Sequence, residues 1–142
     1  MIVLYYPQNT PPKLGRMPLS ALALGAALEG KHDYTIIDGN VDRKAFSTLN
    51  HLLEERTDVE LLAVSVMPGM QMVNAIQHCK KLKARFPRLT IVWGGYFPSM
   101  HTESVLNSDY VDFVIRSQGE RSFLELANAF ARKSSCDSIN NL

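Results

Sequence analysis

The sequence predicts a doubly wound α/β fold, in which one parallel β-sheet is covered by helices on both faces. Short β-rich runs alternate with helical patterns along the whole chain, which is the order of elements that such a fold requires. Most of these runs are apolar at nearly every position, as strands are when both faces of their sheet are covered. A chain of 142 residues, of which 46% are hydrophobic and 20% charged, is long enough for one domain with a core of its own.

The strands are expected in the runs MIVLYY, YTIID, LLAVSVM, LTIVW and VDFVI, at residues 1–6, 34–38, 61–67, 89–93 and 111–115. Successive βα units with right-handed crossovers place these five strands in the flavodoxin-like order 2-1-3-4-5 of Rossmann-like sheets. We expect residues 1–133 to form this single domain. Residues 134–142 are polar and rich in small side chains, which predicts a flexible tail or a linker.

Each expected strand is followed by a run with helical character. The first of these runs, PLSALALGAALEG, has Pro18 in its first turn and Gly30 at its end. It is apolar almost all round, so we expect it to be the most buried helix. The later helices present one apolar stripe each at helical spacing. These stripes are Ala45, Leu49, Leu52 and Leu53; Met72, Ile76, Cys79, Leu82 and Phe86; and Phe123, Leu126, Ala127, Phe130 and Ala131.

The composition argues against several classes of partner and location. A formal net charge of +1 gives no field that would attract nucleic acid or an acidic membrane surface. The apolar runs have the length of strands or are interrupted by charges, so no transmembrane helix is expected, and the N-terminus lacks the basic region of a signal peptide. Cys79 and Cys136 lie far apart and follow no metal-binding spacing, which favours reduced thiols in a cytoplasmic protein.

In a doubly wound fold, ligands bind at the carboxyl ends of the strands. The loops expected there lack the glycines of a dinucleotide fingerprint, a P-loop, a G-x-S-x-G nucleophile elbow and a zinc-binding cluster. The third strand ends in SVMPG, without the aspartate of a phospho-acceptor receiver domain. Asp38 ends the second strand and is expected to serve as a turn residue, because the glycines that accompany a ribose-binding acid are absent.

What these loops do carry resembles a known family. The pieces that match are GRMPLSALALGAALEGKHDYTIIDGN, LLAVSVMPGM, IVWGGYFPSMHTESVL and YVDFVIRSQGERSFLEL. Together they resemble the cobalamin-binding domain at the N-terminus of cobalamin-dependent radical SAM proteins, over residues 1 to about 131. The most specific part is G-G-x-x-P-S followed downstream by VDFVIRSQGE. The family more often has Gly-Glu-Gly-Glu where this chain has Ser117 to Glu120, so Gln118 replaces the first glutamate.

The resemblance implies a cleft along the carboxyl ends of the first, third and fourth strands, where the nucleotide tail of cobalamin runs between the sheet and the neighbouring helices. Gly94 and Gly95 would leave room for the tail, and Ser65 resembles the serine that meets the base of the tail. Pro98 and Ser99 would open the next helix, with Ser99 as its N-cap. The implied cofactor-binding residues are Leu14, Gly15, Arg16, Ser65, Met67, Gly94, Gly95, Pro98, Ser99, Gly119 and Glu120; none is implied as catalytic or as a metal ligand. A tight strand-to-helix turn without a ligand stays open as the alternative for the glycine pair.

The first loop, PQNTPPKLGRMPL, lacks the D-x-H-x-x-G motif whose histidine ligates cobalt in methyltransferase-type cobalamin domains. The resemblance to the radical SAM branch therefore implies base-off cobalamin without a protein histidine ligand. Tyr6, Lys13 and Arg16 stay open as residues beneath the corrin ring. The four histidines, His32, His51, His78 and His101, are expected on helix faces, at the opposite end of the sheet or on the surface.

The iron–sulfur cluster of a radical SAM module needs three cysteines at C-x-x-x-C-x-x-C spacing, which two distant cysteines do not supply. S-adenosylmethionine and the 4Fe–4S cluster are thus expected in a downstream module of the same polypeptide, with methyl transfer or cyclase-type chemistry in the whole protein. A stand-alone domain, or a degenerate domain that serves structure or substrate docking without cobalamin, stays open. A domain for flavin or another nucleotide is disfavoured because the first loop has no glycine- or hydroxyl-rich phosphate cradle.

Overall fold

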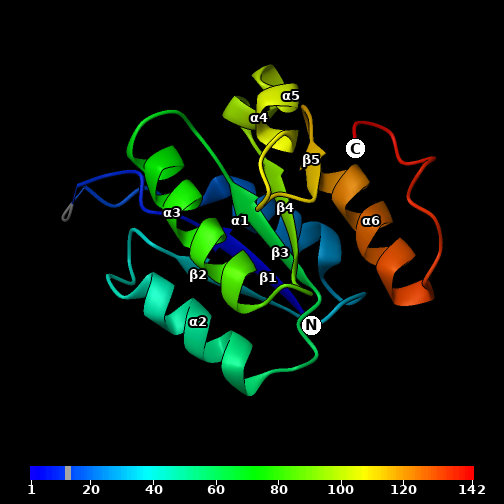
Figure 1. Ribbon diagram of the computed structural model, residues 1–142, viewed down its shortest axis with the longest axis horizontal. Helices are drawn as coiled ribbons and strands as arrows, with labels where there is room; N and C mark the ends of the chain where they lie inside the picture. Colours follow the sequence, from blue (N-terminus) through cyan, green and yellow to red (C-terminus); the bar gives the residue numbers. More distant parts are fainter. Residues whose placement is uncertain (12–13) are drawn as a thin grey trace.

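The computed structural model of the protein describes residues 1–11 and 14–142. Its strands form one all-parallel sheet of five strands in the order β2-β1-β3-β4-β5, which confirms the predicted fold class (Figure 1). The strands are β1 (Ile2–Tyr6), β2 (Tyr34–Asp38), β3 (Leu61–Ser65), β4 (Thr90–Gly94) and β5 (Phe113–Ile115). The third and fifth strands are shorter than expected, because β3 ends at Ser65 and β5 begins at Phe113.

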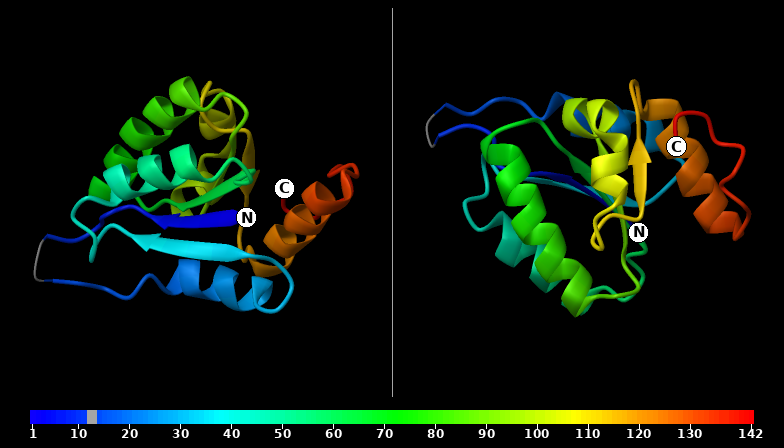
Figure 2. Two further views of the ribbon diagram at one scale, coloured as in Figure 1. Left: turned by 90° about the horizontal axis from the view of Figure 1, so that it is seen from below. Right: turned by 45° about the horizontal axis from the view of Figure 1, so that its top comes forward.

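The helices alternate with the strands and lie on both faces of the sheet (Figure 2). They are α1 (Leu19–Leu28), α2 (Ala45–Glu55), α3 (Met70–Arg85), α4 (Tyr96–Met100), α5 (Thr102–Leu106) and α6 (Glu120–Arg132). One core layer joins the sheet to α2, α3 and α5, and the other joins it to α1 and α6. Side chains on consecutive strand positions enter opposite layers, which explains why the strands are apolar throughout. Among the described residues, no helix combines the length and apolar composition that a membrane span needs.

The expectation that the first helix would be the most buried is wrong. In α1 only Ala21, Gly25 and Leu28 are buried, whereas Leu19 is 68% exposed. Helix α6, which has a strongly polar outer face, buries five residues. A helix that packs on one side of a sheet can bury only the stripe that faces the sheet, so apolar composition on its other side does not become buried.

The end of the chain returns to the domain. After α6, the backbone N–H of Arg116 donates to the carbonyl of Asn141 (2.9 Å), and Ser122 Oγ donates to the carbonyl of Asn140 (2.7 Å). Cys136 and Ile139 are partly buried against the core layer of α1 and α6. These contacts bring residues 134–142 alongside β5 and α6 (Figure 1); their role as a linker stays a prediction.

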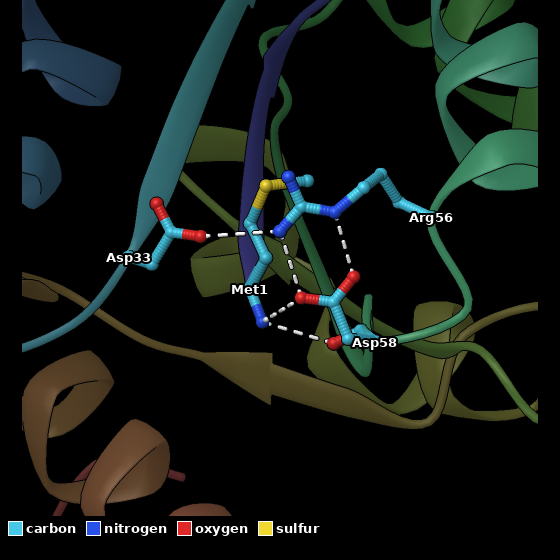
Figure 3. Close-up of polar contacts among 4 residues, drawn as sticks. All are labelled: Met1, Asp33, Arg56 and Asp58. Atoms are coloured by element: carbon cyan, nitrogen blue, oxygen red, sulfur yellow. Dashed lines mark hydrogen bonds and ion pairs between the residues drawn. The ribbon is translucent and has the colours of Figure 1, made fainter.

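The amino edge of the sheet carries a network of charges (Figure 3). Arg56 donates from Nε to Asp58 Oδ1 (2.7 Å), and from Nη2 to Asp58 Oδ2 (2.8 Å) and Asp33 Oδ2 (3.3 Å). The terminal ammonium of Met1 donates to the backbone carbonyl of Asp58 (2.9 Å). The network therefore links the segments that lead into β1, β2 and β3. The Arg56 guanidinium holds the pKa of the Asp58 carboxyl well below its usual range.

This network predicts an acid-sensitive contribution to stability. Because the folded-state pKa of Asp58 lies below the unfolded value of about 3.9, the stabilisation is complete above that pH and is lost as the pH falls through the folded-state pKa. We expect Asp58→Asn to lower the urea midpoint at pH 7 and to make it less dependent on pH between pH 5 and the acid limit of folding. The exposed Asp109→Asn should change neither, and equal pH profiles for the wild type and Asp58→Asn would contradict the assignment. High salt should reduce the difference, since the ions are exposed.

Candidate functional site

A pocket opens between α1 and α6 over the carboxyl ends of β3, β4 and β5, with a volume of about 230 Å³. Its lining consists of Ser20, Leu24, Ala63, Val64, Ser65, Val92, Gly94, Gly95, Ile115, Ser117, Gln118, Gly119, Glu120 and Phe123. The expected cleft along the first, third and fourth strands is therefore displaced by one strand. Over β1 the side chains of Ile2, Leu4 and Tyr6 belong to the core of the same layer, and the lining of the pocket includes no residue of β1.

Small side chains on two neighbouring rungs of the sheet create the floor of the pocket. Ser65 pairs with Gly94 on the rung nearest the carboxyl edge, and Ala63 pairs with Val92 one pleat further in. Residues two apart on a strand point to the same face, so all four face α1 and α6. Because these side chains are small or absent, they leave space beneath α1 and α6, and this space is the pocket.

Gly94 has no evident backbone reason to be glycine. Its φ lies outside the left-handed region, and a Cβ at this position would have its nearest contact at 3.7 Å, with the carbonyl oxygen of Ile115. That distance is an ordinary van der Waals contact, so the strand could hold a side chain here. The side chain would point into the pocket. The missing Cβ thus favours a slot that is kept open for a ligand over a turn that needs glycine.

Gly95 differs, because the backbone does require it. Its φ is +101°, and a Cβ would lie 3.1 Å from the carbonyl oxygen of Val66 and 3.2 Å from its nitrogen. A non-glycine residue is strained in this conformation. Gly95 is also the residue before α4, whose first residue is Tyr96. The pair therefore combines a residue that forms the turn with a residue that leaves the slot open.

The rim of the pocket carries two hydroxyl groups that face each other. Ser20 Oγ and Ser65 Oγ are 2.8 Å apart and share a hydrogen bond, so α1 meets β3 at this point. The sequence analysis missed Ser20. The signal was present, because Ser20 is the one polar side chain in α1 and lies one turn before Leu24 on the same helix face.

The remaining wall comes from the β5–α6 loop, which is held by Ser99. Ser99 Oγ accepts a hydrogen bond from the backbone N–H of Ser117 (2.9 Å) and donates to the carbonyl of Gly95 (2.8 Å). Ser117 adopts a φ of +61°, at the position where the related family more often has glycine. The expected N-cap role of Ser99 is wrong, because α4 begins at Tyr96 and Ser99 lies inside it. Proline is tolerated in a first helical turn, so Pro98 does not mark the start of the helix.

The structure brings some of the predicted site residues together and leaves others apart. Those that line the pocket are Ser65, Gly94, Gly95, Gly119 and Glu120. Those outside it are Leu14, Gly15 and Arg16 in the exposed first loop, Met67 in the exposed β3–α3 loop, and Pro98 and Ser99 in α4. The assignment of all eleven as cofactor-binding stays a prediction.

The first loop is held by amides that the sequence analysis did not single out. Gln71, which is 1% exposed, donates from Nε2 to the carbonyl of Pro7 (3.0 Å) and accepts from the N–H of Met67 (2.9 Å). Asn40 Oδ1 accepts from the backbone N–H groups of Asn9 (3.0 Å) and Thr10 (3.2 Å). The buried amide of Gln71, with both ends bonded, is costly to replace, so it fixes the start of the loop together with the contacts of Asn40 Oδ1.

Of the residues suggested beneath the corrin ring, Lys13 lies outside the described residues, so only Tyr6 and Arg16 can be placed. The hydroxyl of Tyr6 accepts from Asn9 Nδ2 (2.7 Å), and its ring belongs to the core. Arg16 is exposed. Asp38 serves as the expected turn residue, since its Oδ1 accepts from the N–H of Asn40 (2.9 Å).

The histidines have identifiable partners away from the pocket lining. His78 Nδ1 is bonded to the hydroxyl of Tyr5 (2.7 Å), its ring stacks on Phe46, and burial lowers its pKa. His32 is bonded to Asn128, and His51 pairs with Glu55 on α2; His101, between α4 and α5, packs against Phe97. Burial also raises the pKa of Tyr5, so the Tyr5 hydroxyl stays neutral as the partner of His78.

A comparison with protein families now shows the family of the chain. The family model described as "B12 binding domain" matches residues 16–127. The chain belongs to the family of B12-binding domains. The match covers all residues that line the pocket, from Ser20 to Phe123. At the level of the family, it confirms the cobalamin-binding function that the sequence predicted.

Known proteins related to this B12-binding domain are larger than the chain. The anaerobic magnesium-protoporphyrin IX monomethyl ester cyclase of Synechocystis sp. is 25% identical over 138 residues, which is 92% of this chain and 27% of the cyclase. The radical S-adenosylmethionine methyltransferase TsrM of Kitasatospora setae, solved with cobalamin and a 4Fe–4S cluster bound, aligns over 99% of this chain and 26% of its own, with 20% identity and a TM-score of 0.77. The chain therefore spans about a quarter of the length of these proteins.

Two further solved structures, of proteins with different functions, resemble the fold of this chain. The cobalamin-dependent enzyme OxsB, with aqua-cobalamin and S-adenosylmethionine bound, aligns over 99% of this chain and 20% of its own, at 20% identity and a TM-score of 0.81. The response regulator RcsB of Salmonella typhimurium aligns over 95% of this chain and 61% of its own, at 19% identity and a TM-score of only 0.60. At these identities both likenesses show the fold. The B12-binding domain thus shares its fold with a protein of another function.

The different roles of the two glycines can be tested by stability. We expect Gly95→Ala to lower the free energy of unfolding by about 1–3 kcal/mol, because alanine is strained at a positive φ. Gly94→Ala should leave it unchanged or raise it by up to about 1 kcal/mol, since alanine restricts the unfolded chain. Urea unfolding followed by circular dichroism measures both. Equal losses in the two variants would contradict the distinction.

Proposed function

We propose that this B12-binding domain holds cobalamin by its nucleotide tail in the pocket between α1 and α6, on behalf of a radical SAM module in the same polypeptide. The observation that carries the proposal is Gly94, whose missing Cβ opens the pocket although the strand does not need glycine. Gly94 pairs with Ser65, whose hydroxyl bonds Ser20 at the rim and would meet the base of the tail.

The size of the pocket fits a part of cobalamin better than the whole. Its volume of about 230 Å³ lies below the range of about 300–1,000 Å³ that is typical of complete small-molecule sites. The corrin ring would then lie outside, over the carboxyl edge of the sheet. Large apolar side chains that are exposed in loops and helix starts around this edge are available to meet it. They are Leu14, Met17, Met67, Met70 and Tyr96.

We further propose that cobalamin binds base-off and without a histidine from this chain. The pocket would separate the base from the cobalt, and the described histidines are engaged with partners elsewhere. When bound, cobalamin supplies a cobalt centre that can carry a methyl group. The residues of this chain would bind and orient the cofactor: Ser20 and Ser65 at the base, and the first loop beneath the ring.

The chemistry would be completed by a downstream module, which would hold S-adenosylmethionine and a 4Fe–4S cluster and would carry out methyl transfer or cyclase-type chemistry. The support is that the related proteins are about four times longer and include a radical S-adenosylmethionine methyltransferase and a cyclase.

Cys79 of this chain is a structural cysteine that packs against Trp93. Burial raises the pKa of its thiol to about 12, so it stays protonated.

The slot can be tested with Gly94→Val. A β-branched residue suits strand geometry, so the sheet should keep its stability, whereas the new side chain would occupy the path of the tail. We expect the variant to lose cobalamin that the wild type retains after gel filtration, as read from visible absorbance. Thr90→Val at the other end of β4 is the matched control and should retain the cofactor. A folded Gly94→Val protein that retains as much cobalamin as the wild type would falsify the slot.

The same gel-filtration measurement on the wild-type chain, repeated at increasing cobalamin concentrations, separates cobalamin binding from the alternative of a degenerate domain. A wild-type chain that retains no cobalamin at any concentration would instead support a degenerate domain that acts in structure or docking. The visible spectrum of the free ligand, measured in the same buffer, is the reference.

The base-off assignment has its own spectroscopic test. When bound cobalamin is reduced to the paramagnetic cobalt(II) form, an axial nitrogen ligand splits each line of the electron paramagnetic resonance spectrum into a triplet. We expect unsplit lines in the wild type, and no change in His101→Gln, which removes the histidine between α4 and α5. Triplets in the wild type would show a nitrogen ligand, and their loss in His101→Gln would assign it to His101.

A further inference from the structure

The pocket between α1 and α6 changes from polar to apolar with depth. The rim rung holds the Ser65 hydroxyl, bonded to Ser20 of α1. One pleat further in, the floor is Ala63 and Val92. Each helix follows its strand and runs back from the carboxyl edge, so the roof of the inner part is one turn further along, at Leu24 of α1 and Phe123 of α6.

The inner end offers no polar partner to a ligand. The four side chains that line it contain no nitrogen or oxygen, and the backbone groups of β3 and β4 at this depth are engaged in the parallel ladder. A ligand group with an N–H or a ring nitrogen at this depth would lose its hydrogen bonds to water and gain none. An apolar edge would bury its surface against carbon on every side.

Cobamides differ in the base at the end of their nucleotide tail. On the proposed function the base would lead the tail into the pocket, so that its six-membered ring would reach the inner end and its five-membered ring would stay near the rim. In cobalamin the leading edge carries two methyl groups. In a cobamide with adenine it carries ring nitrogens and an exocyclic amine. The ring nitrogen near the rim is present in both and can meet the hydroxyls of Ser20 and Ser65.

We propose that this pocket selects the lower base of its cobamide, and that it accepts a benzimidazole and rejects a purine. The inference rests on the proposed function, since it concerns the same pocket. Val92 and Ala63 are the residues that determine the specificity, because they form the floor at the depth of the discriminating edge. A buried amine without a partner should weaken binding about ten- to hundred-fold.

The test is a comparison of two cobamides that differ only in the base, hydroxocobalamin and its adenine analogue, by equilibrium dialysis against the wild-type chain. We expect the adenine cobamide to bind at least about tenfold more weakly, from the loss of its hydrogen bonds. Equal dissociation constants would overturn the inference while leaving cobalamin binding intact. If the chain holds neither cobamide, the proposed function fails and this inference fails with it.

Variants then locate the specificity. Val92→Thr places a hydroxyl at the inner end with little change in volume, and it should narrow the ratio of the two dissociation constants by about two- to tenfold, the effect of one hydrogen bond. Val114→Thr is the matched control: Val114 is 3% exposed and Val92 is 2% exposed, but Val114 faces the opposite core layer. Val114→Thr should lose about as much stability as Val92→Thr and should keep the wild-type ratio of the two dissociation constants.

Ala63→Ser on the neighbouring strand is the second variant, should Val92→Thr not fold. A ratio that narrows in Val92→Thr or Ala63→Ser and not in Val114→Thr supports the proposal. An unchanged ratio in each of these two variants that folds assigns the preference to other residues and overturns the role given to the floor.

Discussion

The register between β3 and β4 is the constraint on which the rest of the site depends. It pairs Ser65 with Gly94 and Ala63 with Val92, and it turns all four toward α1 and α6. A slip of one residue on β4 would turn the indole of Trp93 into this layer and fill the pocket. Trp93 is held on the other face, 1% exposed, with its indole N–H donating to Cys79 Sγ at 3.3 Å. The pocket on the α1 and α6 face of the sheet therefore depends on the tight packing of Trp93 on the opposite face.

The start of β4 is fixed by charges at the opposite edge. Asp112 Oδ2 accepts from the N–H of Ile91 (2.7 Å) and from Lys83 Nζ (2.7 Å), which also donates to the carbonyl of Leu89 (2.8 Å). Arg56 and its carboxylate partners join the neighbouring strands at the same edge. These ion networks lie at the amino ends of the strands, and the pocket with its mostly neutral lining lies at the carboxyl ends. The ion pairs that fix the starts of the strands are therefore separate from the lining of the pocket.

A chain of hydroxyl contacts connects the walls of the pocket. Ser99 joins the carbonyl of Gly95 to the N–H of Ser117, and Ser20 joins α1 to Ser65. The contacts of Ser99 with Ser117 and of Ser20 with Ser65 bridge different elements, 18 and 45 residues apart in the sequence, at the carboxyl edge. Because the hydroxyls are short, they hold the elements at a fixed spacing, and a tail bound between them would meet a preformed slot with little ordering cost.

The sequence by itself determined the strand order and the families of ligand that the loops could not bind, because apolar runs alternate with helical stripes and the phosphate-binding glycines are absent. It also singled out five residues that line the pocket and lie near strand ends or at the start of α6, where local patterns are informative: Gly94, Gly95, Ser65, Gly119 and Glu120. Only the tertiary structure decided that the pocket lies over β3 to β5. It does so because it shows which side chains of β1 enter the layer of α1 and α6. It also decided the partial exposure of α1, the bridging role of Ser99 and the place of Ser20 at the rim, since each depends on a neighbour that is distant in the chain.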